Sequence, residues 1–374
     1  MKYFLIAGEA SGDLHASNLM AELKQQDHKA EFCFLGGDLM QAQGGQLIKH
    51  YRDMAFMGFI NVLLNLQKVL TNFKECKRAI ADFKPDVVIL IDYPSFNLRM
   101  AKYVKKQFKI PVFYYISPKL WAWKTFRIKS IKKYIDKMYT IFPFETEFYA
   151  QYNYPVTYVG NPTVDSIAQF HANKNSQNFR EENNLDERPI VALLAGSRRQ
   201  EIRKCLPIMV AMADLFSNFQ FLVAAAPGIE QNYYNQFLTS SVKIVSDSTY
   251  ALLDTSYAAI VNSGTATLET GLLKVPQIVV YYVAGERIAS LLKNIFIKTR
   301  YISLVNLIAQ KEVVKELIAH EFTPERVYKE LNKILTDSAY YEQIKAGYDD
   351  IEKQLGKSGT AHRAAVAITA SLSK

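Results

Sequence analysis

The fold of this chain can be read from one stretch, Tyr257-Ala258-Ala259-Ile260-Val261-Asn262-Ser263-Gly264-Thr265-Ala266-Thr267-Leu268-Glu269. An apolar run with the character of a buried strand stops at Asn262, and a helical pattern begins after Gly264. Such a turn leaves main-chain N–H groups unpaired at the helix start, where the helix dipole favours an anion such as phosphate. Glu269 follows about a turn and a half into the helix, where its carboxylate could accept hydrogen bonds from two ribose hydroxyls. The stretch therefore suits a nucleotide, the alternative being an ordinary strand-to-helix turn with Ser263 as N-cap.

The same strand, turn and helix pattern recurs in both halves of the chain. Residues 3–7 form an apolar run that ends in a turn at 8–13, and residues 190–194 lead into Gly196-Ser197-Arg198. Strands separated by helical stretches predict parallel βαβ units. Arg198 could meet a diphosphate with a forked contact at the helix start, although it could also be a surface arginine.

Two domains are expected, because 374 residues exceed what one hydrophobic core usually spans. A composition with 49% hydrophobic and 22% charged residues is typical of a packed globular protein. The polar, Asn-rich stretch 171–188 is the predicted linker. We therefore expect a first domain at 1–170, a second at 185–345, and C-terminal helices at 346–374 that could pack back on the first domain.

The end of the second domain is less regular in pattern. Residues 301–309 are expected to form a loop, and a helix is expected around 313–318. From Thr323 onward the pattern is helical to the end of the sequence.

Composition also disfavours several classes of protein. No cationic start with a cleavage site is present and no apolar run reaches the roughly 18 residues that span a bilayer, so a cytoplasmic, non-spanning protein is expected. Cys33, Cys76 and Cys205 lack paired spacing and are interpreted as reduced packing residues. The net charge of +9 suits an anionic partner, but the basic residues are scattered and no nucleic-acid-binding motif occurs, so nucleic acid is not expected as a partner.

Two further features of the first half could carry chemistry. Asp92 ends the apolar run 87–91, and ligands of parallel sheets bind beyond the carboxyl ends of strands, so Asp92 is a catalytic candidate. A strand-terminal aspartate is also a common turn residue. Trp121 and Trp123 stand close to lysines and could stack on a sugar ring, although paired aromatic residues usually fill a core.

The stretch 57–78 has a helical pattern with an unusually apolar face and basic residues among and after it. This combination suits a helix that lies on an anionic membrane surface. From the residues alone, a helix buried against the sheet is the favoured interpretation.

Two Rossmann-like domains facing one cleft, with phosphate turns in the second, describe the GT-B fold of nucleotide-sugar glycosyltransferases. The chain has no Gly-x-Gly-x-x-Gly sequence, which argues against a dinucleotide dehydrogenase. It has no Asp-x-Asp in a metal-ligand context either, so the diphosphate is expected to be neutralised by arginine, lysine and helix dipoles. No metal or other cofactor is therefore expected.

Eight motifs spread along the chain carry a family resemblance. They are Ile6-Ala7-Gly8-Glu9-Ala10-Ser11-Gly12-Asp13, Met57-Gly58-Phe59, Ile91-Asp92-Tyr93-Pro94-Ser95-Phe96-Asn97, Ile116-Ser117-Pro118 with Trp121-Ala122-Trp123, Phe142-Pro143-Phe144-Glu145, Gly196-Ser197-Arg198, Ser263-Gly264-Thr265-Ala266-Thr267-Leu268-Glu269 and Ser303-Leu304-Val305-Asn306-Leu307. In this order they resemble the bacterial lipid-A-disaccharide synthases over roughly residues 3–320. The order of many separate motifs is far more specific than any one of them.

The resemblance implies an inverting glycosyl transfer. The donor would be UDP-2,3-diacylglucosamine, the acceptor the 6-hydroxyl of 2,3-diacylglucosamine 1-phosphate (lipid X), and the products a β-1,6-linked disaccharide and UDP. Inversion in one displacement needs a base for the proton of the attacking hydroxyl and an electrostatic cradle for the departing diphosphate.

The resemblance also implies roles for individual residues. Asp92 is the favoured base, and His15 is a rival because an imidazole titrates near neutral pH. The residues expected to bind UDP are Ser197, Arg198, Ser263, Gly264, Thr265, Ala266, Glu269 and Asn306. Those expected to line the substrate cleft are Glu9, Ser11, Gly12, Asp13, Trp121 and Trp123.

Acylated substrates reverse the interpretation of the apolar stretch, because an enzyme that takes them from a bilayer must dock on it. The residues expected to face the membrane are Phe59, Leu63, Leu64 and Leu66. The resemblance thus implies a cytoplasmic protein peripherally bound to the inner membrane, and it allows a homodimer.

The chain departs from the commoner family pattern at three positions. Ala195 replaces a proline, Asn61 a glutamate and Lys124 an arginine, so any role of that acidic position and any forked phosphate contact after the tryptophans are in doubt. The alternatives are another UDP-sugar enzyme, either a UDP-N-acetylglucosamine 2-epimerase or the lipid-intermediate transferase of peptidoglycan synthesis, or a catalytically silent nucleotide-binding scaffold at a membrane.

Overall fold

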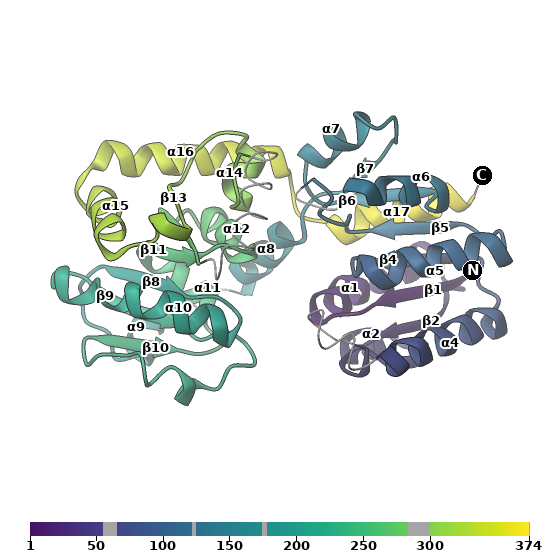
Figure 1. Cartoon of the computed structure of the whole chain (residues 1–374), viewed down its shortest axis with the longest axis horizontal. Coiled ribbons are helices and arrows are strands. Elements are labelled where there is room, and N and C mark those ends of the chain that lie inside the picture. The colour runs from purple at the N-terminus through teal and green to yellow at the C-terminus, as the bar shows by residue number, and fades with distance from the viewer. Residues whose placement is uncertain (55–65, 122–124, 174–177, 283–299, 374) are drawn as a thin grey trace. The chain divides into compact units, whose positions relative to one another are not determined.

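The computed structural model describes residues 1–54, 66–121, 125–173, 178–282 and 300–373 (Figure 1). The chain divides into two compact units. The first consists of Met1–Pro162 together with Lys357–Lys374, and the second of Thr163–Gly356. Each unit contains its own parallel sheet with helices packed on it, so the predicted α/β class with two Rossmann-like domains is confirmed.

The first unit contains a seven-stranded sheet of order β3-β2-β1-β4-β5-β6-β7, in which every strand pair is parallel. Its strands are β1 (Lys2–Ala7), β2 (Glu31–Gly36), β3 (Gln46–His50), β4 (Val87–Ile91), β5 (Val112–Tyr115), β6 (Lys137–Thr140) and β7 (Thr157–Tyr158). Its helices are α1 (Ala10–Gln26), α2 (Asp38–Ala42), α4 (Leu66–Phe83), α5 (Pro94–Gln107), α6 (Ile128–Tyr134), α7 (Phe144–Ala150) and α17 (Thr360–Leu372).

Successive side chains of these strands point to opposite faces of the sheet, which gives the unit two apolar layers. Phe4 and Ile6 of β1 pack with residues of α4, α5 and α6, whereas Tyr3 and Leu5 pack with residues of α1 and α17. The last helix of the chain therefore helps to cover the first strand.

The second unit contains a six-stranded parallel sheet of order β10-β9-β8-β11-β12-β13. Its strands are β8 (Ile190–Leu194), β9 (Gln220–Ala224), β10 (Val242–Val245), β11 (Ser256–Asn262), β12 (Gln277–Tyr281) and β13 (Glu316–Ile318). Its helices are α8 (Pro162–Asn173), α9 (Phe179–Glu182), α10 (Arg199–Val210), α11 (Thr249–Asp254), α12 (Thr265–Leu272), α14 (Leu304–Ala309), α15 (Pro324–Thr336) and α16 (Ser338–Leu355).

The strand order reverses once in each sheet, between β1 and β4 in the first unit and between β8 and β11 in the second. In open parallel sheets the connections leave to opposite sides at such a point, and ligands bind beyond the carboxyl ends of the strands there. The two points coincide with the turns after Ala7 and Ile91 and with those after Leu194 and Asn262.

One local prediction is wrong. Residues 316–318 form strand β13, which pairs with β12, and the helix lies earlier, at Leu304–Ala309, where a loop was expected. A short apolar run is compatible with either state, and here it completes the sheet edge beside β12. The helical prediction from Thr323 onward agrees with α15, α16 and α17.

Candidate functional site

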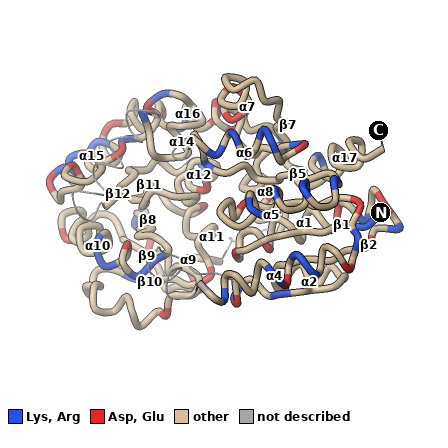
Figure 2. The backbone as a smooth tube through the Cα atoms, turned by 45° about the vertical axis from the view of Figure 1, so that its right-hand side comes forward, with Lys and Arg blue, Asp and Glu red and all other residues tan. Residues whose placement is uncertain are grey.

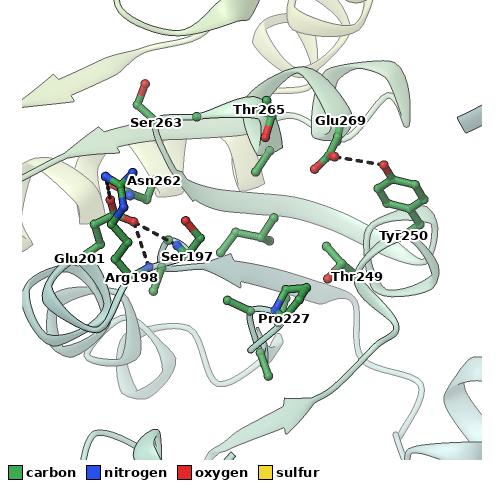
Figure 3. Close-up of a pocket in the computed structure, with 18 residues that line it drawn as sticks. Ser197, Arg198, Glu201, Pro227, Thr249, Tyr250, Asn262, Ser263, Thr265 and Glu269 are labelled. Atoms are coloured by element: carbon green, nitrogen blue, oxygen red, sulfur yellow. Dashed lines mark hydrogen bonds and ion pairs between the residues drawn. The ribbon is translucent and has the colours of Figure 1, made fainter. Parts of the chain in front are cut away.

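The turn after β11 has the form expected of an anion site. The strand ends at the buried Asn262, and α12 begins at Thr265 with Gly264 as its N-cap residue. The Thr267 side chain donates a hydrogen bond of 2.8 Å to the Gly264 carbonyl oxygen, which steadies the first turn of the helix. The start of α12 thereby presents Thr265 and Ala266 to a cavity (Figure 3).

The turn after β8 depends on a glycine. Gly196 has a φ of +113°, in the left-handed region that favours glycine. A Cβ atom at this position would lie 2.5 Å from Oε2 of Glu201 and 2.7 Å from Nδ2 of Asn262. The two turns are thus packed directly against each other, and no larger residue fits between them.

Glu201 stabilises the turn after β8, a role that was not predicted from the sequence. Its Oε2 accepts hydrogen bonds from the main-chain amides of Ser197, at 3.0 Å, and Arg198, at 3.3 Å. Its Oε1 lies 3.4 Å from Nη1 of Arg198 (Figure 3). A glutamate at the third position of a helix commonly reaches back in this way to the helix start, so the spacing after Arg198 was an available signal.

Glu269 lies at the other end of the same cavity. Its Oε1 accepts a hydrogen bond of 3.0 Å from the Tyr250 hydroxyl (Figure 3). Burial raises the pKa of the Glu269 carboxyl, and the hydrogen bond from Tyr250 acts in the opposite direction. The pairing leaves the Glu269 carboxylate in the wall of the cavity. No sequence motif pointed to Tyr250 as its partner.

These residues line one cavity of about 580 Å³, which we call the β8–β11 cavity. Pockets for small ligands usually measure several hundred Å³. The predicted UDP-binding residues in its wall are Ser197, Arg198, Ser263, Gly264, Thr265, Ala266 and Glu269. The other wall residues, which were not predicted to bind UDP, are Leu194, Ala195, Gly196, Glu201, Ala224, Ala225, Ala226, Pro227, Thr249, Tyr250 and Asn262.

Asn306 does not lie in this wall. Its side chain is fully buried, where Nδ2 donates to the Val314 carbonyl oxygen at 2.8 Å and to Oε1 of Glu316 at 2.9 Å. Its Oδ1 accepts from the amides of Val313 and Val314 at 2.8 and 3.0 Å. Asn306 therefore ties α14 to the segment leading into β13, and the structure shows it as part of the scaffold.

The first unit carries a second polar site, at the end of β4. Asp92 and Tyr93 both have left-handed backbone conformations, with φ values of 41° and 46°. The pKa of Asp92 is raised to about 6, mainly by burial and secondly by the nearby negative charge of Glu9. The positive charge of Lys119 acts in the opposite direction. A carboxyl group with this pKa is ionised at neutral pH and able to accept a proton.

The turn after β1 packs against the same place. A Cβ atom on Gly8 would lie 2.3 Å from the Tyr93 ring, so a glycine is needed where this ring covers the main chain. Gly12 is buried, with its Cβ position 3.3 Å from Cβ of Ala7. Ser11 is exposed and Glu9 is partly exposed.

Asp13 has a scaffold role in the structure. Its buried carboxylate accepts hydrogen bonds from the amides of Gly37, Leu39 and Met40 at 2.8 to 3.1 Å. It therefore caps the start of α2 and joins α1 to that helix. His15 lies further along α1 and is partly exposed.

The remaining predicted residues divide between described and undescribed parts of the chain. Trp121 is partly buried, and its ring packs edge-on against Phe144 with 5.2 Å between centroids. Trp123, Phe59, Leu63 and Leu64 lie outside the described residues, as does the side chain of Leu66, the first residue of α4.

Comparison with known proteins decides the family. A family model described as lipid-A-disaccharide synthetase matches residues 3–369. This chain belongs to the lipid-A-disaccharide synthase family. It is therefore a glycosyltransferase by family, as the eight motifs predicted.

Named relatives match over nearly their whole length. The lipid-A-disaccharide synthase of Myxococcus xanthus is 38% identical, with 98% of this chain and 96% of the relative covered. The lipid-A-disaccharide synthase of Geobacter metallireducens is 34% identical, with 100% and 98% covered.

Solved structures of similar fold bind or transfer sugars, at a sequence identity that shows the fold alone. A UDP-GlcNAc 2-epimerase from Neisseria meningitidis bound to UDP-GlcNAc has a TM-score of 0.64 and 15% identity, with 100% of this chain and 99% of that chain covered. The calicheamicin glycosyltransferase CalG4 has a TM-score of 0.62 and 13% identity, with 99% and 98% covered. This chain thus has the fold of the GT-B glycosyltransferases and UDP-GlcNAc 2-epimerases, as the sequence predicts.

Neither a membrane-spanning helix nor a cluster of metal ligands is found among the residues that the structure describes. Among the helices that the structure describes, none is both long and apolar enough to span a membrane. Within the same residues, no three or more His, Cys, Asp or Glu side chains are grouped as metal ligands would be.

Proposed function

We propose that this chain transfers 2,3-diacylglucosamine from UDP-2,3-diacylglucosamine to the 6-hydroxyl of lipid X, with inversion at the anomeric carbon. The observation that carries the proposal is the β8–β11 cavity, in which two helix-start turns and Glu269 come together in a member of the lipid-A-disaccharide synthase family. A cavity with this arrangement provides amides and an arginine for a diphosphate and a carboxylate for a ribose.

The proposed reaction assigns one role to each group. The acceptor hydroxyl oxygen attacks the anomeric carbon from the face opposite the diphosphate, and Asp92 takes the hydroxyl proton. The carbon–oxygen bond to the diphosphate breaks, and its electron pair leaves with UDP. Arg198 and the turns at Ser197 and Ser263 stabilise the negative charge that develops on the leaving group.

The protein's own residues suffice for these roles as written, so the proposal includes no metal. Arg198 suits the diphosphate because its side chain is 68% exposed and its guanidinium is only loosely held by Glu201, at 3.4 Å. The ribose would meet the carboxylate oxygen of Glu269 that does not already accept from Tyr250. His15 remains the second candidate for the base.

The test is to incubate the protein with both acylated substrates and to look for the disaccharide and UDP by mass spectrometry. Arg198→Gln should lower turnover, whereas Arg199→Gln should not, because the Arg199 side chain lies over the Tyr233 ring and does not line the cavity. Absence of product while UDP still binds would favour a silent scaffold. Conversion of UDP-N-acetylglucosamine to its 2-epimer would favour the epimerase.

We also propose peripheral attachment to the inner membrane from the cytoplasm. The described part of α4 supports it, because Leu70 is 52% exposed and a groove between α4 and α5 is lined by basic side chains. These are Lys77, Arg99, Lys102 and Lys106. Figure 2 marks Lys and Arg positions along the backbone of both helices. An apolar face beside basic residues is typical of segments that bind anionic lipid surfaces.

Liposome flotation tests this attachment. Replacing Leu63, Leu64 and Leu66 by serine should weaken binding to phosphatidylglycerol vesicles without unfolding the protein. Leu215→Ser serves as a control, since Leu215 is an exposed apolar residue of the second unit. Global unfolding of the triple variant would instead support a core role for these leucines. A homodimer, also proposed, is tested by sedimentation equilibrium.

A further inference from the structure

The Asp92 turn, formed by Asp92 and Tyr93, has an uncommon backbone. Two consecutive residues other than glycine adopt left-handed conformations, with φ values of 41° and 46°. Residues with a Cβ atom are rarely found there, because the side chain crowds the backbone. Such conformations persist where surrounding contacts determine them, and they are concentrated at functional sites.

Asn97 provides one of those contacts. It lies in the first half of α5 and is fully buried. Its Nδ2 donates to the carbonyl oxygen of Asp92 at 2.7 Å and to that of Ile91 at 3.1 Å. A longer contact of 3.4 Å reaches the carbonyl oxygen of Ile6 in β1. One amide group therefore spans the ends of both strands at the point where the strand order reverses.

Tyr114 provides a second contact to the same atom. It lies in β5 and is fully buried, and its hydroxyl donates to the carbonyl oxygen of Asp92. That oxygen thus accepts from two buried side chains that come from different elements, α5 and β5. If Asp92 relaxed to an ordinary strand conformation and its carbonyl oxygen moved, Tyr114 would lose this acceptor and Asn97 would lose the shortest of its three contacts.

The Tyr93 side chain fixes the other half of the turn. Its ring lies over Gly8, and its hydroxyl donates to the Met54 carbonyl oxygen at 3.3 Å. The main-chain amide of Asp92 also remains in the sheet, donating to the Tyr115 carbonyl oxygen at 3.1 Å. The turn is therefore held on both sides, and its conformation decides the direction in which the Asp92 carboxylate leaves the backbone.

We propose that Asn97 and Tyr114 are positioning residues for the reaction, which hold the Asp92 turn in its left-handed conformation and thereby aim the Asp92 carboxylate at the acceptor hydroxyl. The inference rests on the proposed role of Asp92 as base. A base that is displaced by about 1 Å can lose roughly 100-fold in rate, so small changes in this turn should reach turnover.

The test compares Tyr114→Phe, which removes only the hydroxyl, with Tyr139→Phe. Tyr139 is also buried in this sheet, but its hydroxyl donates to the Ala367 carbonyl oxygen of α17. Tyr114→Phe should lower kcat roughly 10- to 100-fold while leaving the Kd for UDP, which the second unit is proposed to bind, unchanged. Tyr139→Phe should leave both constants unchanged. Asn97→Ser, with its Tm measured, provides a second variant with the same expected pattern.

A double-mutant cycle with Asp92→Asn separates a positioning role from a structural one. If Tyr114 acts through Asp92, Tyr114→Phe has no further effect on the residual turnover of Asp92→Asn. An equal loss in both backgrounds overturns the inference, as does unchanged kcat in Tyr114→Phe and Asn97→Ser while Asp92→Asn is impaired. Nearly full activity of Asp92→Asn instead removes the base assignment and the inference with it, so the two failures are distinguishable.

Discussion

The Tyr250 hydroxyl donates a hydrogen bond of 3.0 Å to the Glu269 carboxylate at the end of the β8–β11 cavity. The pair joins α11 to α12, and the Tyr250 ring also packs edge-on against Phe170, with 5.7 Å between centroids. Burial raises the pKa of the Glu269 carboxyl, and the Tyr250 hydroxyl fixes the position of this carboxylate.

Loss of that phenol should weaken nucleotide binding. In Tyr250→Phe the carboxylate loses a donor, so its pKa should rise further and the Kd for UDP should increase roughly tenfold. The parent's affinity should fall as pH decreases through the raised pKa of Glu269, and in the variant this fall should begin at a higher pH. Isothermal titration calorimetry across pH measures both effects, with Tyr233→Phe as control. Equal affinity of variant and parent at all pH values would contradict the role of the pair.

The pH dependence of turnover should report Asp92. Since its pKa is raised to about 6, kcat should fall as pH decreases through about 6, and Asp92→Asn should lose ~10²–10⁴-fold in kcat. Glu9→Gln removes a negative neighbour and should move the acid limb to lower pH, whereas Lys119→Gln removes a positive one and should move it to higher pH. Shifts in the same direction for both variants would show that the limb belongs to another group.

Two glycines with positive φ allow the cost of backbone strain to be distinguished from the cost of steric crowding. Gly196 and Gly228 have φ values of +113° and +81°, but only at Gly196 would a Cβ atom meet neighbours, whereas at Gly228 it meets nothing within 4 Å. Gly228→Ala should lower the free energy of unfolding by about 1 kcal/mol. Gly196→Ala should lower it by clearly more and should also weaken UDP binding, because Glu201 must move from the Ser197 amide. Urea denaturation and calorimetry check this order, and equal losses would show that the crowding is relieved at little cost.

Glu145 should make the stability of the protein depend on pH. It is buried at the start of α7, where burial raises its pKa to about 7 despite hydrogen bonds from the amides of Phe142 and Ile141. Its folded-state pKa exceeds the unfolded value near 4.5, so its contribution to stability is fully present below pH 4.5 and is lost as pH rises through 7. Each unit of pKa separation corresponds to about 1.4 kcal/mol.

The parent should therefore lose stability from pH 5 to pH 8, whereas Glu145→Gln should not. The free energy of unfolding of the variant minus that of the parent should be larger at pH 8 than at pH 5. The measurement is urea denaturation at both pH values, with Glu147→Gln, at an exposed position of the same helix, as control. A constant difference between parent and Glu145→Gln at the two pH values would mean that Glu145 does not titrate in this range.

The patterns that were predictable from the sequence are local. Strand runs that end in Gly-containing turns revealed both sheets, and the spacing from Ser263 to Glu269 placed a helix start and a carboxylate in one cavity because both lie on one element. Long-range partners were not predictable in this way. Asp13 meets amides 24 to 27 residues away, and Tyr250 precedes Glu269 by 19 residues on another helix.

Asn306 is a motif residue whose hydrogen-bond partners were not predictable from the sequence either. Its motif suggested a ligand contact, but the side chain is satisfied by residues of its own neighbourhood, from Val313 to Glu316. A polar side chain can serve in a buried hydrogen-bond network of the protein as well as in a contact with a ligand. Only the positions of the partners distinguish the two cases, and these depend on where β13 is placed.

The return of residues 357–374 to the first unit has a consequence for the order of folding during synthesis. Ala364, Ala365 and Ile368 of α17 complete the apolar layer that α1 begins, yet they leave the ribosome after the whole second unit. The second unit, Thr163–Gly356, is contiguous and can close its core while translation continues. The first unit is synthesised first, but one face of its sheet stays incompletely covered until α17 has been synthesised.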